Sequence, residues 1–296
     1  MHPTMRVGAC SLSPVPGDIE ENLKFIKKWT IKGADEEVDL LLFPELSLSG
    51  YWLNHELYDK AQPRDGPAIT NLVEFLAERQ LDIAISVGLA EEHGGTIYNT
   101  QILLDKDGER YFYRKTHWPP EEYSYWGMGN EYPVHRFKDF TIAATICYDN
   151  NFPEIHRIYG LQGSDLVLAP YFYGKQFSPD DMDSITDSIF DWKNREKMYL
   201  RASAAANYHW IVACVGAGPV SDKYVQNGNE GETYYVPGVI LFVDPEGNVV
   251  KESSDEEVVV QLLWYDIDLA ENMRVRKSGH NHFKNRRPDT YGKLVE

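Results

Sequence analysis

The sequence predicts an α/β fold in a single domain spanning residues 1–296. Short apolar segments alternate with segments of helical periodicity, and several of the apolar segments are continuous. Continuous runs of Val, Ile and Leu are typical of sheets that are buried on both faces. No Pro/Gly/Ser-rich linker, internal repeat or low-complexity tract divides the chain. These observations favour one α/β domain over two.

Strands are predicted wherever an apolar, β-branched run of suitable length is bounded by turn residues. The predicted strands are residues 38–45, 81–91, 96–105, 109–118, 140–149, 164–170, 209–218, 236–244 and 257–268. Turn signals at residues 106–109 and 245–248 join neighbouring strands.

Helices are predicted for four segments. Ile19, Leu23 and Ile26 fall on one stripe of residues 18–34, and Gly33 can end that helix. The other three are residues 68–79, a segment that follows Pro153, and the long alanine-rich segment 191–208. Two stretches, 171–190 and 218–235, are too long and polar for simple connections. Such loops are often functional, although surface decoration is an equal alternative.

The charge balance argues against two classes of partner. With 29 Lys and Arg against 46 Asp and Glu, the net charge is −17 at pH 7. A chain this acidic is unsuited to coating nucleic acid or an anionic membrane. No apolar stretch approaches the roughly 18 to 20 residues of a membrane span, and the first residues lack the features of a signal peptide. We therefore expect neither a nucleic-acid nor a membrane partner.

The cysteines bear on the cellular compartment of the protein and on whether it binds a metal. Cys10, Cys147 and Cys214 leave at least one thiol unpaired, which suits a reducing cytoplasm. They do not approximate a C-x-x-C spacing, and no H-E-x-x-H motif or histidine cluster offers metal ligands. The sequence therefore predicts a cytoplasmic protein that needs no metal or other cofactor.

Three ionisable side chains, Glu45, Lys115 and Cys147, lie at or near the ends of apolar runs. Sites in α/β proteins are usually built where strands end. A carboxylate within hydrogen-bond reach can take the proton of a thiol, and a nearby ammonium favours the thiolate and can stabilise an oxyanion. The three residue types therefore suit nucleophilic catalysis without a histidine.

Each of these residues also has a structural explanation. A strand-terminal glutamate often caps or pairs with a surface lysine, a single lysine is usually solvated, and a single cysteine in an apolar run is usually structural. Spacing alone leaves this catalytic set as one hypothesis among several.

Three sequence blocks resemble the signature blocks of the nitrilase superfamily of carbon–nitrogen hydrolases. LLFPELSLSGY, YRKTHWPPEE and ICYDNNFPE are similar, in that order, to the family's P-E-x-x-x-x-G-Y, R-K-x-H-x-P and C-Y-D-x-x-F-P-E blocks. Further similar segments extend the resemblance through nearly the whole chain; they are DLVLAPYF, RASAAANYHWIVACVGAG, GVILFVDPEGNVV and VVVQLLWYDIDL. The resemblance implies a four-layer α-β-β-α sandwich and a Glu-Lys-Cys catalytic set.

The same resemblance implies a role for each matched residue. Glu45 is the general base, Lys115 stabilises the oxyanion, Cys147 is the nucleophile, and the Tyr148 N–H is the second oxyanion donor. Many members carry another glutamate six residues before a P-G turn. Glu122 stands six residues before Met128, which replaces that proline. Glu122 is therefore predicted to position the substrate, with the adjacent Glu121 as the alternative.

The resemblance also implies hydrolysis of an amide or ureide through a cysteine thioester. Tyr148-Asp149 follows the nucleophile, whereas the nitrile-hydrolysing branch more often has Trp-Glu there. Asn150 and Asn151 stand where the N-carbamoyl-D-amino-acid branch carries two arginines, so a carboxylate-bearing substrate is disfavoured. A nitrilase, an acyltransferase and a non-catalytic binding scaffold remain as alternatives.

Aromatic side chains in segments that flank the proposed site are candidate walls of a substrate pocket. The candidate substrate-binding residues are Tyr51, Tyr123, Tyr125, Trp126, Tyr171, Phe172 and Tyr173, together with Asn150 and Asn151. The expected partner is a small amide, ureide or nitrile. Family members usually assemble as dimers, so the resemblance implies a homodimer or a higher homo-oligomer.

Overall fold

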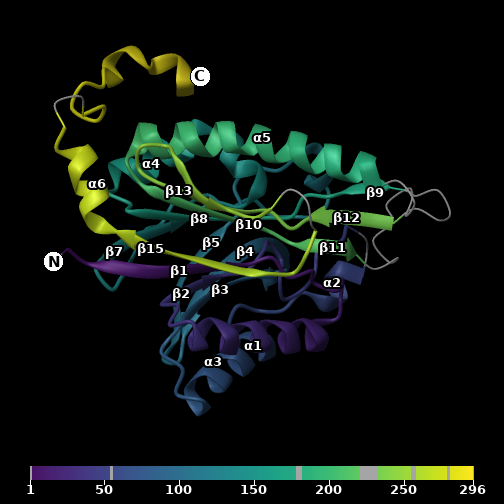
Figure 1. The fold of residues 1–296 in the computed structure, drawn as a ribbon. Helices are drawn as coiled ribbons and strands as arrows, with labels where there is room; N and C mark the ends of the chain where they lie inside the picture. The colour runs from purple at the N-terminus through teal and green to yellow at the C-terminus, as the bar shows by residue number, and fades with distance from the viewer. Residues whose placement is uncertain are drawn as a thin grey trace.

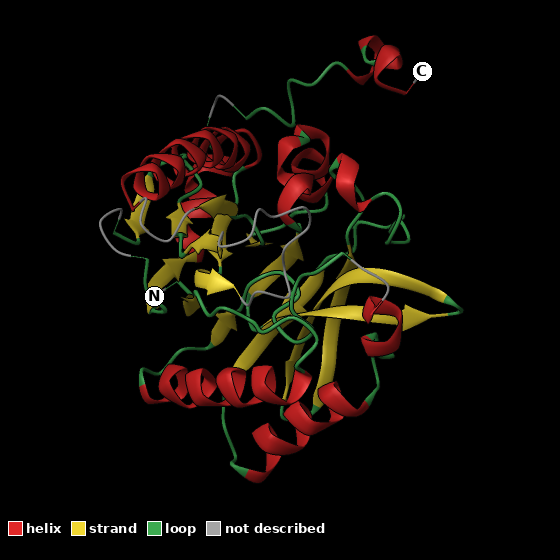
Figure 2. Cartoon of the chain, turned by 90° about the vertical axis from the view of Figure 1, so that its right-hand side faces the viewer, coloured by secondary structure: helices red, strands yellow, loops and turns green. Residues whose placement is uncertain are grey.

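Two sheets pack face to face, and helices cover the outer face of each sheet (Figure 1, Figure 2). The computed structural model describes residues 2–53, 56–177, 182–220, 233–254, 258–278 and 281–295. The layers follow one another as helix, sheet, sheet and helix, which confirms the predicted four-layer α-β-β-α sandwich.

The first sheet has the strand order β15-β1-β2-β3-β4-β5. Its strands are β1 (Thr4–Cys10), β2 (Leu40–Leu42), β3 (Ala84–His93), β4 (Thr96–Asp105), β5 (Gly108–Arg114) and β15 (Leu262–Asp268). β1, β2 and β3 run parallel, and the remaining pairs are antiparallel. Helices α1 (Ile19–Asp35) and α3 (Pro67–Glu78) cover its outer face. There Ile26 of α1 and Leu72 of α3 belong to one buried cluster with Leu41 and Ile85.

The second sheet has the strand order β14-β13-β10-β8-β7-β6. Its strands are β6 (His135–Phe137), β7 (Phe140–Ala144), β8 (Leu166–Tyr171), β10 (Trp210–Val215), β13 (Ile240–Val243) and β14 (Val249–Glu252). β7, β8 and β10 run parallel at its centre. Helices α4 (Pro153–Leu161) and α5 (Met182–Asn207) cover its outer face, where Tyr159 and Leu200 are buried against Val167 and Ile211.

The two sheets share an apolar interior. Val7 and Leu40 from the first sheet lie in the same buried cluster as Ile142, Leu168 and Val212 from the second. Because both faces of the central strands are covered, these strands read as continuous apolar runs rather than as alternating ones.

Smaller elements complete the fold. A third sheet joins β9 (Lys175–Phe177), β12 (Thr233–Pro237) and β11 (Ala217–Val220). The remaining elements are α2 (Glu56–Lys60), α6 (Leu269–Arg276), and the 3₁₀ turns η1 (Pro120–Glu122), η2 (Cys147–Asn151), η4 (Pro288–Thr290) and η5 (Gly292–Val295). The C-terminal residues stand off from the sandwich beyond α6 (Figure 1, Figure 2). No helix among the described ranges is both long and apolar enough to cross a bilayer.

Several predicted boundaries differ from the structure. The strand predicted for 140–149 ends at Ala144, and the one predicted for 38–45 is reduced to Leu40–Leu42. The chain leaves the sheet early in both places because Cys147 and Glu45 occupy turns. Segments 209–218 and 236–244 each divide into two strands, and β1 was not predicted at all.

Both predicted loops contain regular secondary structure. Segment 171–190 contains β9 and the first turns of α5, and its residues 178–181 lie outside the described ranges. Segment 218–235 contains the end of β11 and the start of β12, and its residues 221–232 lie outside the described ranges. Residue 257, the predicted start of the last strand, also lies outside them.

Candidate active site

A buried lysine lies between two buried carboxylates. Glu45 follows β2, Lys115 follows β5, and Glu122 ends η1. The Lys115 Nζ atom is 2.9 Å from Glu45 Oε1 and 2.8 and 2.9 Å from the two carboxylate oxygens of Glu122. All three side chains are at most 1% exposed. Because an unpaired buried charge is costly, each charge in this cluster depends on the others.

The Glu45 carboxylate is held at both oxygens. Asn99 Nδ2 donates to Oε1 at 2.7 Å, and the Phe172 N–H donates to Oε2 at 2.6 Å. The turn that carries Glu45 crosses Gly88 of β3, where an added Cβ would lie 2.1 Å from the backbone nitrogen of Leu46. Glycine permits this close approach of two backbone segments. The position of Glu45 is therefore fixed through its backbone as well as its side chain.

Cys147 opens η2 with a φ of +49°, which is uncommon for a residue other than glycine. Its side chain is half-buried, and Sγ donates to the Phe172 carbonyl at 3.6 Å. The Tyr148 N–H near the start of η2 has no acceptor in the part of the chain that the structure describes. The two backbone groups of Phe172 therefore contact both Cys147 and Glu45.

Burial and mutual charge set the ionisation of this cluster. Burial opposes the charge of Lys115, but Glu122 and Glu45 outweigh it and raise its pKa well above the ordinary value. Burial, and then the charge of Glu45, raise the pKa of Glu122 to about 7 against the opposing effect of Lys115. Burial and the Glu45 carboxylate also raise the pKa of the Cys147 thiol, although Lys115 lowers it. The thiol is therefore protonated at neutral pH until a base takes its proton.

Asp149 links the segment that follows Lys115 to the turn that carries Cys147. Its buried carboxylate accepts hydrogen bonds from the His117 N–H at 2.9 Å, from the Ile146 N–H at 2.9 Å and from the Tyr113 hydroxyl at 2.8 Å. Thr116 donates to it through its hydroxyl at 3.0 Å. Sequence reasoning used Asp149 only to separate branches of the family and missed this role. The sequence offered one signal for this role, the position of Asp149 inside the third family block, ICYDNNFPE.

The two asparagines after Asp149 differ in their surroundings. Asn150 is buried, its Nδ2 donates to the Cys147 carbonyl at 3.0 Å, and its Oδ1 accepts from the Thr145 hydroxyl at 2.8 Å. His156 Nε2 lies 3.1 Å from the same oxygen. Asn151 is half-buried. The polar atoms of Asn150 are thus engaged within the turn that carries Cys147.

Several of the predicted pocket aromatics surround the charged cluster. Tyr51 stacks on Phe172 with ring centroids 4.5 Å apart, and its hydroxyl donates to Glu122 Oε1 at 2.7 Å. Trp126 is buried in the same apolar cluster, and Tyr125 packs against it. Tyr171 instead belongs to the cluster between the second sheet and α5.

Two of the predicted site residues face solvent. Tyr123 is 60% exposed and packs edge-on against Trp118. Glu121 is exposed, whereas its neighbour Glu122 is buried against Lys115. Of the two adjacent glutamates, the structure therefore brings Glu122 and not Glu121 into the cluster.

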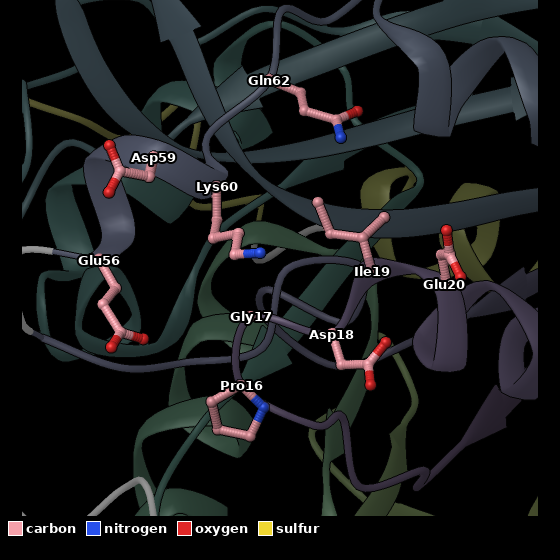
Figure 3. A pocket seen from close by; sticks show the side chains of 9 residues that line it. All are labelled: Pro16, Gly17, Asp18, Ile19, Glu20, Glu56, Asp59, Lys60 and Gln62. Carbon is pink, nitrogen blue, oxygen red and sulfur yellow. The ribbon is translucent and has the colours of Figure 1, made fainter.

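A separate hollow of about 570 Å³ lies between the start of α1 and α2 (Figure 3). Lys60 extends toward Gly17 and Ile19, and the carboxylates of Asp18 and Glu20 lie nearby. None of the predicted site residues lines this hollow. Within the described ranges, no three His, Cys, Asp or Glu side chains are grouped so that they could hold a metal ion.

Comparison with known proteins adds a family match. The carbon–nitrogen hydrolase family model matches residues 6–277. The chain is 28% identical to an (R)-stereoselective amidase of Pseudomonas sp., over 99% of this chain and 95% of the relative. It is 26% identical to an N-carbamoylputrescine amidase of Solanum lycopersicum, over 94% and 91%. A solved carbon–nitrogen hydrolase of Helicobacter pylori G27 superposes with a TM-score of 0.82 at 20% identity, over 100% of this chain and 99% of that one.

Proposed function

Because this chain belongs to the carbon–nitrogen hydrolase family, we propose that it hydrolyses a primary amide or an N-carbamoyl group and releases ammonia. The names of two relatives, an (R)-stereoselective amidase and an N-carbamoylputrescine amidase, support this substrate class. The observation that carries the proposal is the position of Phe172, whose carbonyl contacts the Cys147 thiol and whose N–H binds Glu45. This contact keeps a base beside a nucleophile without a histidine.

In the proposed first step, Glu45 takes the proton of the Cys147 thiol as the sulfur attacks the carbonyl carbon. The raised pKa of the half-buried Cys147 thiol makes this transfer necessary, because little thiolate exists before substrate binds. The carbonyl oxygen becomes an oxyanion, which in this proposal Lys115 Nζ and the Tyr148 N–H stabilise. Glu122 and Tyr51 keep the ammonium of Lys115 in position.

In the proposed second step, the carbon–nitrogen bond breaks and Glu45 delivers its proton to the leaving nitrogen. Ammonia departs and a thioester on Cys147 remains. Glu45 then removes a proton from a water molecule that attacks the thioester. When this second oxyanion collapses, the product acid leaves and the sulfur regains its proton. The residues return to their starting state, so the cycle is balanced.

The proposal is tested with Cys147→Ala and Glu45→Gln on matched panels of primary amides, N-carbamoyl amines and nitriles. Ammonia release should fall at least about 1000-fold in each variant, because the two residues act as one unit. Cys10→Ala is the matched control, since Cys10 is buried at the end of β1, in the cluster under α1 and α3, and its loss should leave turnover nearly unchanged. Wild-type rates in Cys147→Ala would contradict the proposal. Faster hydrolysis of nitriles than of amides would favour the nitrilase alternative.

The raised pKa of Glu122 predicts that both activity and stability depend on pH. All of its hydrogen-bond partners are donors, namely Lys115 and the Tyr51 hydroxyl, so its ionised form fits the site. Its pKa of about 7 therefore predicts that kcat/KM falls as the pH drops below about 7. The same raised pKa has the opposite effect on stability. The contribution of Glu122 to the free energy of unfolding is fully present below its ordinary pKa of 4.5 and is lost as the pH rises through about 7.

The measurement is a pH profile of kcat/KM beside a pH series of thermal unfolding, for the wild type and for Glu122→Gln. The variant should be slower and should lack the acid limb near pH 7. An unchanged acid limb in Glu122→Gln would assign that limb to another group.

We propose further that the protein works in the cytoplasm as a homo-oligomer. Its three cysteines are all free, which suits a reducing compartment. The C-terminal residues carry Leu294 and Val295, which are 67% and 90% exposed and could be covered by a second copy. Light scattering of the purified protein should give a mass above that of one 34.0 kDa chain.

A further inference from the structure

A buried pair of histidines lies behind the turn that carries Cys147. His156 belongs to α4, His209 directly precedes β10, and neither side chain is exposed to solvent. His156 Nδ1 lies 3.2 Å from His209 Nε2, and His209 Nδ1 lies 2.9 Å from the Ser164 hydroxyl. On the other side of the pair, His156 Nε2 lies 3.1 Å from Asn150 Oδ1. The two rings therefore join Asn150 to Ser164 through one row of hydrogen bonds. The proposed mechanism uses neither ring.

Both rings are neutral at neutral pH. Burial lowers the pKa of His156 to about 4, against the opposing effect of Asp149. Burial, and then the charges of His156, Arg276 and Arg157, lower the pKa of His209 well below its ordinary value. A neutral imidazole has one N–H donor and one acceptor nitrogen. Each ring therefore links one donor to one acceptor.

The partners of Asn150 fix the direction of these hydrogen bonds. The Cys147 carbonyl only accepts, so the Asn150 amide places Nδ2 there, at 3.0 Å, and turns Oδ1 toward His156. His156 must then donate from Nε2 and accept at Nδ1. His209 in turn donates from its own Nε2, and the Ser164 hydroxyl donates to its Nδ1. Every donor in the row is thus directed toward the Cys147 carbonyl.

The Cys147 turn depends on such support. Cys147 has a φ of +49°, and a residue other than glycine keeps such a conformation only where its surroundings hold it. Asn150 Nδ2 binds the Cys147 carbonyl directly, and His156 binds the oxygen of the same amide. The Thr145 hydroxyl shares that oxygen, so without His156 the amide would be held from one side only.

Resting on the proposed amide hydrolysis, we propose that His156 is a positioning residue whose Nε2–H orients the Asn150 amide and thereby places Cys147 for attack. His209 and Ser164 keep His156 in the tautomer that donates to Asn150. His156 is neither the base nor an oxyanion donor in the proposed mechanism. Its loss should therefore lower kcat and leave substrate binding intact.

The test compares two substitutions of His156. His156→Gln keeps an N–H donor for Asn150 and cannot take up a proton, whereas His156→Leu fills a similar volume without any donor. Thr30→Val is the matched control in α1, on the opposite outer layer. It also removes a buried hydrogen bond, the one from the Thr30 hydroxyl to the Ile26 carbonyl at 2.8 Å. Thermal unfolding of each variant identifies the temperatures at which it is fully folded.

His156→Leu should lower kcat by about 10- to 100-fold and change KM by less than about threefold. His156→Gln and Thr30→Val should keep kcat within about threefold of the wild type. Iodoacetamide alkylation of Cys147 should slow about tenfold in His156→Leu, because the sulfur is displaced from its base. Cys10 and Cys214 are fully buried, so alkylation of the folded protein reports Cys147.

Nitrogen-15 NMR of histidine-labelled protein tests the tautomer directly. The signal of His156, assigned by its loss in His156→Gln, should show a proton on Nε2 and none on Nδ1 at pH 7. A proton on Nδ1 would contradict the direction of the hydrogen bonds and overturn the inference.

The kinetic outcomes separate this inference from the proposed function. Wild-type kcat in folded His156→Leu, or equally low kcat in His156→Leu and His156→Gln, would overturn the role of His156 alone. An absence of Cys147-dependent hydrolysis of every amide and N-carbamoyl compound would instead overturn the proposed function. In that case the alkylation rates still decide whether His156 places the Cys147 sulfur, and equal rates in His156→Leu and the wild type would show that it does not.

Discussion

Replacing Lys115 with methionine should abolish amide hydrolysis and lower the free energy of unfolding by about 3 kcal/mol or more. The substitution leaves the buried carboxylates of Glu45 and Glu122 facing one another without the ammonium that lies within 2.9 Å of both. It also removes a proposed oxyanion donor, a loss that typically costs about 100- to 1000-fold in kcat. Methionine fills a similar volume, so the effect reports the charge rather than a cavity.

The pH dependence of the lost unfolding free energy identifies the cause of the destabilisation. If the unpaired carboxylates destabilise Lys115→Met, its loss of unfolding free energy relative to the wild type should shrink at acidic pH, because Glu122, whose pKa is raised, becomes neutral there. Urea unfolding between about pH 4 and 8 measures the deficit. The control is Lys24→Met, whose partner Glu21 is at the surface, and this change should cost less than about 1 kcal/mol. A deficit independent of pH would contradict the electrostatic explanation.

The sequence predicted the family and the four layers, and the family match together with the observed layers confirms both. It predicted less well how the site residues come together. Glu45 and Cys147 were expected near strand ends, and they follow β2 and β7, which belong to different sheets. The two side chains approach each other because the sheets pack face to face, and Lys115 joins them from the end of antiparallel β5. A periodic pattern identifies a strand, but it does not reveal which sheet the strand enters.

The residues that sequence reasoning missed are buried polar groups. Asn99 binds Glu45 from β4, where its neighbours Thr100 and Gln101 are also buried and polar within an otherwise apolar strand. That run of polar residues signals buried hydrogen bonds in β4, but it does not reveal that Glu45 is the partner of Asn99. Glu196 gave no signal, because on an exposed helix face a glutamate is the expected residue. Only the contacts of α5 with η2 and of Glu196 with Tyr171 in β8 show that this glutamate is buried.

Strand β1 was missed for a different reason. Gly8 interrupts its apolar pattern, and an added Cβ there would lie 3.0 Å from Leu41 and 3.1 Å from Val38. Close packing against the neighbouring strand, rather than strand propensity, therefore explains the glycine.

Asp149→Asn should destabilise the protein by about 3 kcal/mol and lower kcat by about 100-fold with little change in KM. Asp149 accepts from the N–H groups of His117 and Ile146 and from the hydroxyls of Tyr113 and Thr116. An asparagine amide turns one acceptor into a donor that faces these donors, so at least one buried N–H or hydroxyl loses its partner. His117 is two residues from Lys115, and Ile146 directly precedes Cys147, so a shift at either end separates the nucleophile from its oxyanion donor.

The split between kcat and KM distinguishes this positioning role from a loss of folded protein. If part of the protein is unfolded, the apparent kcat falls in proportion to the folded fraction, and this loss disappears at low temperature, where the protein is fully folded. If the Cys147 turn is displaced, kcat stays low even in fully folded enzyme. Asp107→Asn is the matched control, since that carboxylate is 66% exposed and pairs with Arg110 at the surface. Wild-type kcat in folded Asp149→Asn would show that the contact between the two segments is structural only. A low kcat would show that one buried carboxylate holds both halves of the proposed site in register, because Cys147 and Lys115 follow strands of different sheets and no backbone hydrogen bond joins these two described residues.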